Sequence, residues 1–82
     1  MSLELYQDVI LTADLPEHGL CAGDVGVLVD RHSVPGKPEG FSVEFFDMTG
    51  TTVAVVSLAS TYLRAPTASD RPSSRTFAAS GA

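Results

Sequence analysis

The chain has 82 residues, a formal net charge of -5 and a single cysteine, Cys21. This length allows one domain with a modest core. One cysteine excludes a disulfide within the chain and fits a reducing cytoplasm. No stretch approaches the roughly 20 apolar residues of a membrane-spanning helix, and the start Met1-Ser2-Leu3 lacks the basic region of a signal peptide. We therefore expect a cytoplasmic protein that binds no membrane.

The charge is divided unevenly along the chain. Residues 1–65 contain nine acidic and three basic residues, a balance of -6, and residues 66–82 have a balance of +1. An acidic domain repels phosphate backbones, because Lys and Arg must neutralise them for nucleic acid to bind. Nucleic acid is therefore disfavoured as a partner.

The first half of the chain predicts two strands. Residues 6–12 are rich in aliphatic and β-branched side chains, and residues 24–32 follow with three valines in alternation. Pro16 lies between them and cannot donate to a strand ladder, so residues 15–20 are expected to form a surface loop. A second exposed loop is expected at residues 33–40, which contain two prolines and two glycines.

The second half predicts three more strands. Residues 41–45 alternate strictly between apolar and polar side chains. Residues 47–50 have the pattern of a type I turn in which Gly50 adopts the left-handed conformation, and residues 51–57 return as a fourth strand. One helical turn at 58–61 leads into a short last strand at 62–64.

These elements indicate an all-β fold, a small five-stranded SH3-like barrel with one short helical turn before the last strand. Residues 1–65 form this domain. Residues 66–82 contain Phe77 as their only large apolar side chain, which is too little burial to offset the entropy of ordering, so we expect a disordered tail. The alternative is an oligonucleotide-binding barrel, but that fold usually has a helix between its third and fourth strands.

Alternation assigns the apolar strand residues to two faces. Gly26 lies opposite the three valines of its strand, where it marks a bend or a close approach of another backbone. The face predicted to form the core comprises Val9, Leu11, Val25, Val27, Val29, Phe41, Val43, Phe45, Val53 and Val55. The opposite face comprises Ile10, Leu28, Phe46 and Val56. Closure of the barrel covers this second set, or it stays exposed and forms a candidate partner surface.

Three residues could bind a metal or react as a nucleophile pair. His18 and Cys21 are separated by two residues, and His32 ends the second predicted strand. Structural zinc needs four protein ligands and catalytic zinc three, and further partners are missing. A Cys-His nucleophile would also need an oxyanion site. We therefore expect no metal, no cofactor and no catalytic activity, with these three residues as the reactive group to watch.

The acidic residues and glycines around the first loop have simpler interpretations. Asp14, Glu17, Asp24 and Asp30 cluster in sequence, but carboxylates near turns are usually solvated, and Asp24 suits a local role in accepting backbone N–H bonds. The glycine spacing of this region, Gly19, Gly23 and Gly26, matches neither a phosphate-binding loop nor a dinucleotide fingerprint.

The run Leu15-Pro16-Glu17-x-Gly19-Leu20-x-x-Gly23-Asp24-x-Gly26, together with Val43-Glu44-Phe45 and Leu63-Arg64, resembles a small bacterial family catalogued as a domain of unknown function. The resemblance covers residues 6–65 and implies an SH3-like barrel. More weakly, the chain is similar to the SH3-like half of the nitrile hydratase beta subunit. That second resemblance implies a barrel built for contact with another chain, but not the enzyme, whose metal is held by cysteines of the other subunit.

Three functions follow as hypotheses. The first is a non-catalytic protein-interaction module that forms a homodimer or higher oligomer, or binds a protein encoded by a neighbouring gene; such a partner would be basic. The second is an accessory subunit of a hydratase-like metalloenzyme that uses His18, Cys21 and His32. The third is a nucleic-acid-binding barrel, which the acidic charge disfavours.

Overall fold

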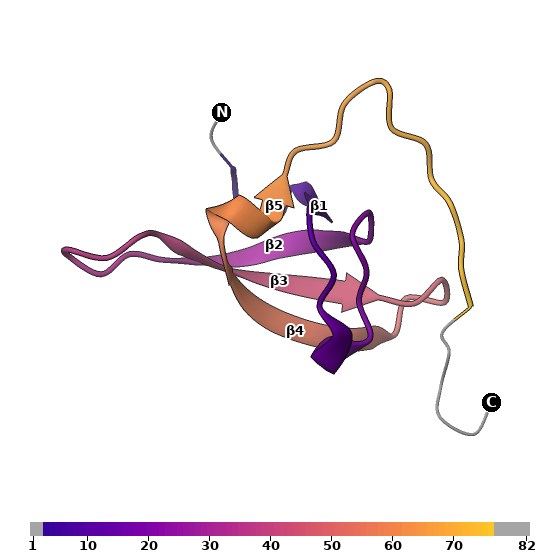
Figure 1. The fold of residues 1–82 in the computed structure, drawn as a ribbon, viewed down its shortest axis with the longest axis horizontal. Coiled ribbons are helices and arrows are strands. Elements are labelled where there is room, and N and C mark those ends of the chain that lie inside the picture. Colours follow the sequence, from indigo (N-terminus) through magenta and orange to yellow (C-terminus); the bar gives the residue numbers. More distant parts are fainter. Residues whose placement is uncertain (1–2, 77–82) are drawn as a thin grey trace.

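Five antiparallel strands form one bent sheet in the computed structural model, which describes residues 3–76. The strand order is β4-β3-β2-β1-β5, so the first strand lies between the second and the last, and β4 forms one edge (Figure 1). The strands are β1 (Asp8–Leu11), β2 (Val25–His32), β3 (Gly40–Phe46), β4 (Thr52–Ala59) and β5 (Leu63–Arg64). Two short 3-10 helices, η1 (Pro16–His18) and η2 (Ser60–Tyr62), lie in the connections.

The all-β prediction with a helical turn before the last strand is confirmed, but the turn begins later than predicted. β4 extends to Ala59, and η2 begins at Ser60. Leu58 was assigned to the turn, yet it lies opposite Phe41 of β3 in the strand register and is buried. A core-facing leucine two positions after Val56 continues the alternation of the strand, so the helical turn starts only after Leu58.

The connection between β3 and β4 has the predicted geometry. The Gly50 N–H donates to the carbonyl of Asp47 at 3.0 Å, and Gly50 has a φ of 89°. The Asp47 N–H in turn donates to the carbonyl of Thr51 at 2.9 Å. A side chain with a Cβ atom would be strained at this φ, which explains the glycine.

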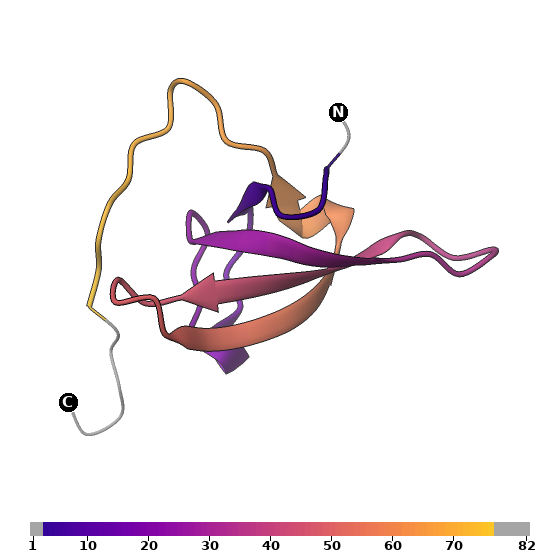
Figure 2. The ribbon, with the colours of Figure 1, turned by 180° about the vertical axis from the view of Figure 1, so that it is seen from behind.

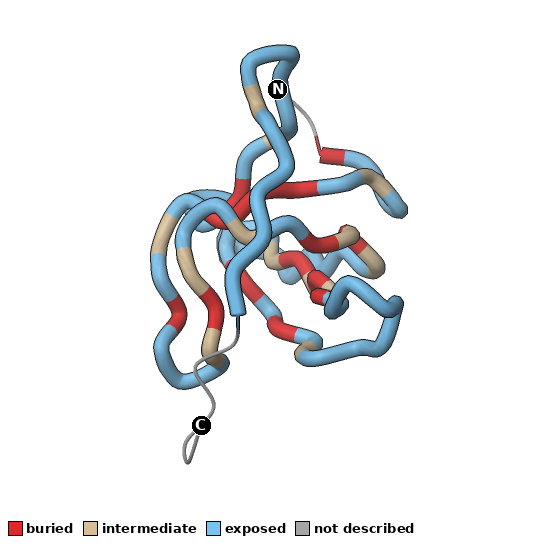
Figure 3. The backbone as a smooth tube through the Cα atoms, turned by 90° about the vertical axis from the view of Figure 1, so that its right-hand side faces the viewer, coloured by how far each residue is buried: buried red, intermediate tan, exposed pale blue. Residues whose placement is uncertain are grey.

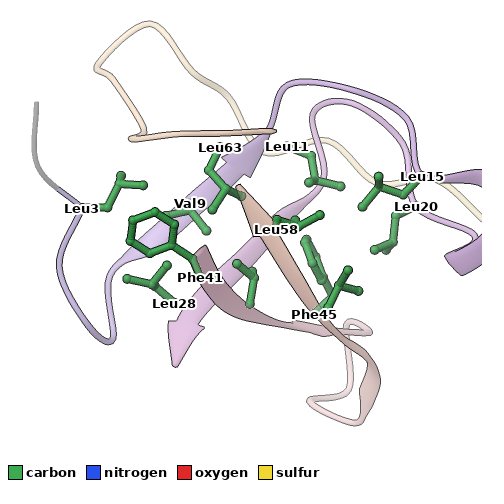
Figure 4. Packing of buried hydrophobic residues seen from close by; sticks show 12 residues of the cluster. Leu3, Val9, Leu11, Leu15, Leu20, Leu28, Phe41, Phe45, Leu58 and Leu63 are labelled. Carbon is green, nitrogen blue, oxygen red and sulfur yellow. The ribbon is translucent and has the colours of Figure 1, made fainter. Parts of the chain in front are cut away.

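The core lies on the concave side of the bent sheet and is almost entirely aliphatic and aromatic (Figure 4). Phe45, Leu11, Leu28, Val9 and Val43 are its largest fully buried side chains. The cluster contains Leu3, Val9, Leu11, Leu15, Leu20, Leu28, Phe41, Val43, Phe45, Val56, Leu58 and Leu63. Leu15 and Leu20 flank η1 and pair with each other through an isolated bridge, so the first loop closes one end of the core. The loop between β2 and β3 is exposed throughout. Most buried residues lie in the strands, and the tail is largely exposed (Figure 3).

The predicted core face is correct for β1 and β3 but wrong for β2 and β4. Leu28 is fully buried and Val56 is 7% exposed, whereas Val25, Val53 and Val55 are all more than half exposed. Both strands have apolar residues on both faces, so alternation alone does not identify the inner one. Packing against β3 decides it, because the register places Leu28 and Val56 on either side of Val43. Val29 is partly buried at a register shift between Leu28 and Asp30.

Gly26 faces the core, and this explains why its neighbours in β2, Val25 and Val27, face outward. A Cβ atom at this position would lie 2.5 Å from Val43 Cγ1 and 2.9 Å from Phe45 Cε1. The β2 backbone therefore approaches these two side chains more closely than any other residue type permits. The prediction of a close backbone approach at Gly26 is confirmed by the carbonyl oxygen of Glu44, which would lie 3.0 Å from the added Cβ, but two side chains of β3 come closer still.

Residues 66–76 form no helix or strand, but two ion pairs attach them to the domain, which the prediction of a disordered tail over residues 66–82 does not include. Asp70 pairs with Arg64 of β5, and Arg75 pairs with Asp24 at the start of β2. The segment arches away from β5 and returns past the end of the sheet where β3 meets β4 (Figures 1 and 2). Residues 77–82, including Phe77, lie outside the described residues.

Candidate interaction surface

The convex face of β2, β3 and β4 carries exposed apolar side chains near the β3–β4 turn. Val25, Phe46, Val53 and Val55 are 51%, 42%, 56% and 59% exposed. We call these four residues the outer apolar face. They belong to three adjacent strands, because β3 pairs with both β2 and β4. Isolated exposed apolar residues are common on proteins, but neighbouring ones on one sheet face are characteristic of an interaction surface.

Glu44 is a charged residue that lies among these side chains. The register places it between Val27 and Val55 on the same face of the sheet. Thr52 donates its hydroxyl hydrogen to Glu44 Oε2 at 2.5 Å, which holds the carboxylate over β4. Both Val27 and Glu44 are partly buried. The face therefore combines aliphatic and aromatic surface with one oriented negative charge.

The predicted partner surface of Ile10, Leu28, Phe46 and Val56 is not formed as a set. Leu28 and Val56 point into the core, and Ile10 is 5% exposed, on the opposite side of β1 from Val9. Phe46 alone is exposed and belongs to the outer apolar face. The sequence-based prediction interchanges the inner and outer faces of β2 and β4. Val25, Val53 and Val55, which it assigns to the core, therefore lie on the outer face, where a partner surface is expected.

The structure separates His32 from His18 and Cys21. His18 ends η1 and is exposed, and Cys21 is partly buried in the same loop as a free thiol. His32 ends β2, whose eight residues extend for about 23 Å at roughly 3.3 Å per residue. His32 Nε2 lies 2.7 Å from the Ser42 hydroxyl. Across residues 3–76, no group of three or more His, Cys, Asp or Glu side chains is placed to hold a metal ion.

The loop before β2 forms a turn whose acidic side chains accept backbone hydrogen bonds. The Cys21 N–H donates to Asp24 Oδ2 at 2.9 Å, and the Ala22 N–H donates to Asp14 Oδ1 at 2.8 Å. The Gly23 N–H donates to the carbonyl of Leu11, which ties the turn to β1. The local role predicted for Asp24 is therefore confirmed.

The same Asp24 carboxylate binds Arg75 from the far end of the described chain. Arg75 Nε lies 3.2 Å from Asp24 Oδ1, and its terminal nitrogen Nη2 lies 2.5 Å from Oδ2 and 3.1 Å from the carbonyl of Gly19. Partial burial raises the pKa of Asp24, but the hydrogen bonds from Arg75 and Cys21 outweigh burial and lower the pKa overall. The contact joins residues 51 positions apart.

An open depression of about 480 Å³ lies at the other end of the sheet, between the N-terminal segment, β2 and β5. Its two arginines already have partners. Arg31 donates to the carbonyl of Leu3, lies 3.6 Å from Glu39 and covers the Phe41 ring at 5.9 Å. Arg64 pairs with Asp70 through two nitrogens, at 2.7 and 2.9 Å. The depression therefore presents neither free positive charge nor a grouping suited to reaction chemistry.

Sequence reasoning missed two parts of this surface for different reasons. The exposure of Val25 follows from the position of Gly26, and the glycine among valines was the available signal. The exposure of Val53 and Val55 follows from the pairing of Val56 with Val43, which has no local signal. The contact between Arg75 and Asp24 had no local signal, because the two residues are brought together only by the path of the tail.

Comparison with known proteins identifies one relationship. A family model described as a domain of unknown function (DUF4926) matches residues 5–65. This range covers all five strands and ends before the tail. No curated protein matches the chain, and no solved structure matches it. Within residues 3–76, the structure contains no helix of the length and apolar character needed to cross a membrane.

Proposed function

The chain belongs to the DUF4926 family of domains of unknown function, and we propose that it is a non-catalytic protein-interaction module. Its partner is a different protein, which binds the outer apolar face with an apolar segment that carries a basic side chain. The observation that supports this proposal is the exposure of Val25, Phe46, Val53 and Val55 on one face of a sheet that is otherwise well packed.

Charge favours a basic partner over a second copy of the chain. Glu44 lies within the face, so self-association would bring two carboxylates together as water is excluded, which is unfavourable. The formal net charge of -5 adds repulsion at longer range. A Lys or Arg of the partner would instead pair with Glu44, and opposite charges would speed association.

The edge of the sheet at β4 offers a second attachment beside the same face. β4 is an edge strand of eight residues, and its sequence from Thr52 to Ala59 contains no charged residue and no proline. Sheet edges are usually protected by such residues, because their unpaired N–H and C=O groups accept another strand. An extended segment of the partner would hydrogen-bond along β4 while its side chains contact Val53 and Val55.

Three further predictions from the sequence are part of this proposal: the type of barrel, the contact with another chain and the cytoplasmic location. The strand order and the 3-10 turn before β5 support an SH3-like barrel. The resemblance to the nitrile hydratase beta subunit supports a role in contact with another chain, and the single free cysteine supports a cytoplasmic location. The metal-handling alternative gains no support, because β2 separates His32 from Cys21.

Selection from a random dodecapeptide library on the immobilised full-length protein tests this function. We expect enriched peptides to combine aliphatic residues with Lys or Arg. Val55→Lys should abolish their binding, because it places a positive charge in the face. Val34→Lys is the matched control, since Val34 is 53% exposed in the loop between β2 and β3, and it should bind the peptides as the wild type does.

Three results would overturn the proposal. Failure to enrich any peptide, or binding that Val55→Lys leaves unchanged, would show that the outer apolar face is not the site. Light scattering at micromolar concentration provides the second test: a dimer that Val55→Lys dissociates would identify a second copy of this chain as the occupant.

A further inference from the structure

The turn at residues 19–24 is held in shape by the domain itself. Backbone N–H groups of Cys21 and Ala22 orient the carboxylates of Asp24 and Asp14, and the Leu11 N–H donates to the carbonyl of Asp24 at 2.9 Å. None of these bonds involves the tail. Asp24 Oδ1 and Oδ2 therefore keep their position whether or not Arg75 is bound, which makes the turn a preorganised acceptor.

The guanidinium group of Arg75 fits the acceptors of this turn in geometry as well as in charge. Nε and Nη2 donate to the two oxygens of Asp24, and Nη2 also donates to the carbonyl of Gly19. Three bonds from one planar guanidinium use its fixed fork of donors, which a lysine ammonium lacks. Asp14 adds negative charge nearby that also favours the charged form of Arg75. The turn therefore distinguishes arginine from lysine.

The described part of the tail, residues 66–76, is attached to the domain near its beginning, through Asp70, and through Arg75. Thr67 and Arg64 both donate to Asp70, which fixes the beginning of the tail beside β5. Ser73 and Ser74 are exposed, and Arg71 donates only to the nearby carbonyls of Ala68 and Asp70. Displacement of Arg75 would release this segment without disturbing the core.

We propose that the turn at residues 19–24 is a binding site for an arginine side chain of the partner protein, and that Arg75 occupies it in the free protein as a displaceable latch. Val25 directly follows Asp24, so an arginine bound here would lie next to the outer apolar face. The partner segment is thereby specified further: it carries an arginine at the end that meets the start of β2. This identification of the partner rests on the proposed function, whereas the guanidinium site itself does not.

The strength of the latch follows from its exposure. Arg75 is 43% exposed and Asp24 22% exposed at their side chains. Exposed ion pairs shift an equilibrium by at most about fivefold. If the Arg75–Asp24 pair has that strength, it lowers the apparent affinity for a competing ligand by at most about sixfold. The ligand binds only those molecules in which Arg75 has left the turn. Higher salt screens the pair and weakens both the latch and the competitor.

Titration of the full-length protein with N-acetyl-arginine amide, followed by amide chemical shifts in NMR, tests the site. In the Arg75→Gln variant no arginine of the chain occupies the turn. The amide signals of residues 19–25 in this variant should shift with increasing probe concentration until they saturate. The wild type should bind the same probe about two- to sixfold more weakly. Arg71→Gln is the matched control, since it removes an arginine of the same tail that does not reach the turn, and it should match the wild type. N-acetyl-lysine amide should bind Arg75→Gln more weakly than the arginine probe.

Three outcomes would each overturn the inference: no saturable shift in Arg75→Gln, equal affinity for the arginine probe in Arg75→Gln and the wild type, or equal binding of the arginine and lysine probes. Asp24→Asn keeps an acceptor for the Cys21 N–H but removes the charge, and it should lose the probe. If Asp24→Asn does not fold, the comparison of Arg75→Gln with the wild type still decides.

The proposed interaction surface and the proposed arginine site can each be disproved without the other. Loss of library peptides in Val55→Lys with no probe binding at the turn would leave the interaction surface standing and remove the arginine site. Probe binding without peptide enrichment would leave a guanidinium site whose partner does not use the outer apolar face.

Discussion

Gly26 decides which side chains of β2 face the core. It lies at the one core position of β2 where Val43 and Phe45 leave no space for a Cβ atom. Its neighbours Val25 and Val27 consequently face outward, and Val25 becomes part of the outer apolar face. A residue without a side chain thus determines which side chains of β2 are exposed.

Gly26→Ala should destabilise the protein by about 1–3 kcal/mol, because the added methyl group overpacks a full core. In a domain of this size the midpoint of thermal unfolding should fall by at least about 4 °C. Gly40→Ala is the matched control, since the nearest atom to its added Cβ would be 3.9 Å away. Equal melting temperatures for the two variants would contradict the close packing at Gly26.

β4 combines two roles at the scale of the element. Its inner residues Val56 and Leu58 complete the core, and its outer residues Val53 and Val55 belong to the proposed interaction surface. The strand is also an edge of the sheet. Pairing with β3 and burial of the inner residues hold β4 in place, which leaves the outer face available for a partner.

Alanine substitution of adjacent valines tests the phase of β4. Val56→Ala should lower the free energy of unfolding by about 1.5–3 kcal/mol, since it removes two buried carbon groups and leaves a cavity. Val55→Ala should change it by less than about 1 kcal/mol, because the side chain is exposed and only strand propensity is affected. Urea unfolding of the two variants measures both values. A larger loss for Val55→Ala would reverse the assignment of the two faces.

At the scale of the whole molecule, acidic residues stabilise the fold through local hydrogen bonds as well as giving it a negative charge. The Thr49 side chain and the N–H groups of Thr51 and Thr49 donate to Asp47 and lower its pKa. Arg64 and Thr67 hold the pKa of Asp70 well below its usual range. Asp24 also has a lowered pKa. Asp47 stabilises the β3–β4 turn within itself, Asp70 attaches the beginning of the tail to β5, and Asp24 joins the turn before β2 to Arg75 of the tail.

The pH dependence of stability follows from these shifts. A carboxylate whose pKa is lower in the folded state stabilises the fold above its unfolded pKa of about 3.9, and this stabilisation is lost as the pH falls toward the folded value. We expect a nearly constant melting temperature from pH 7 to about pH 5 and a decline below about pH 4. The difference between the wild type and Asp47→Ala should shrink over the same decline. Calorimetry at pH 7, 5, 4 and 2.5 measures both, and a difference that grows at low pH would contradict the assigned role of Asp47.

Local sequence patterns were enough to predict the five strands, the turn at Asp47–Gly50, the backbone bonds to Asp24 and the aromatic core of β3, because each depends on neighbouring residues or on strict alternation. They were not enough to orient β2 and β4. Both strands have apolar residues on both faces, with Leu28 opposite the valines of β2 and Val56 opposite Val53 and Val55 in β4, so the inner face is decided only when Val43 and Phe45 of β3 pack against these strands. The position of Arg75 was equally inaccessible, since a contact across 51 positions depends on where the assembled sheet places Asp24 and on how far the tail reaches.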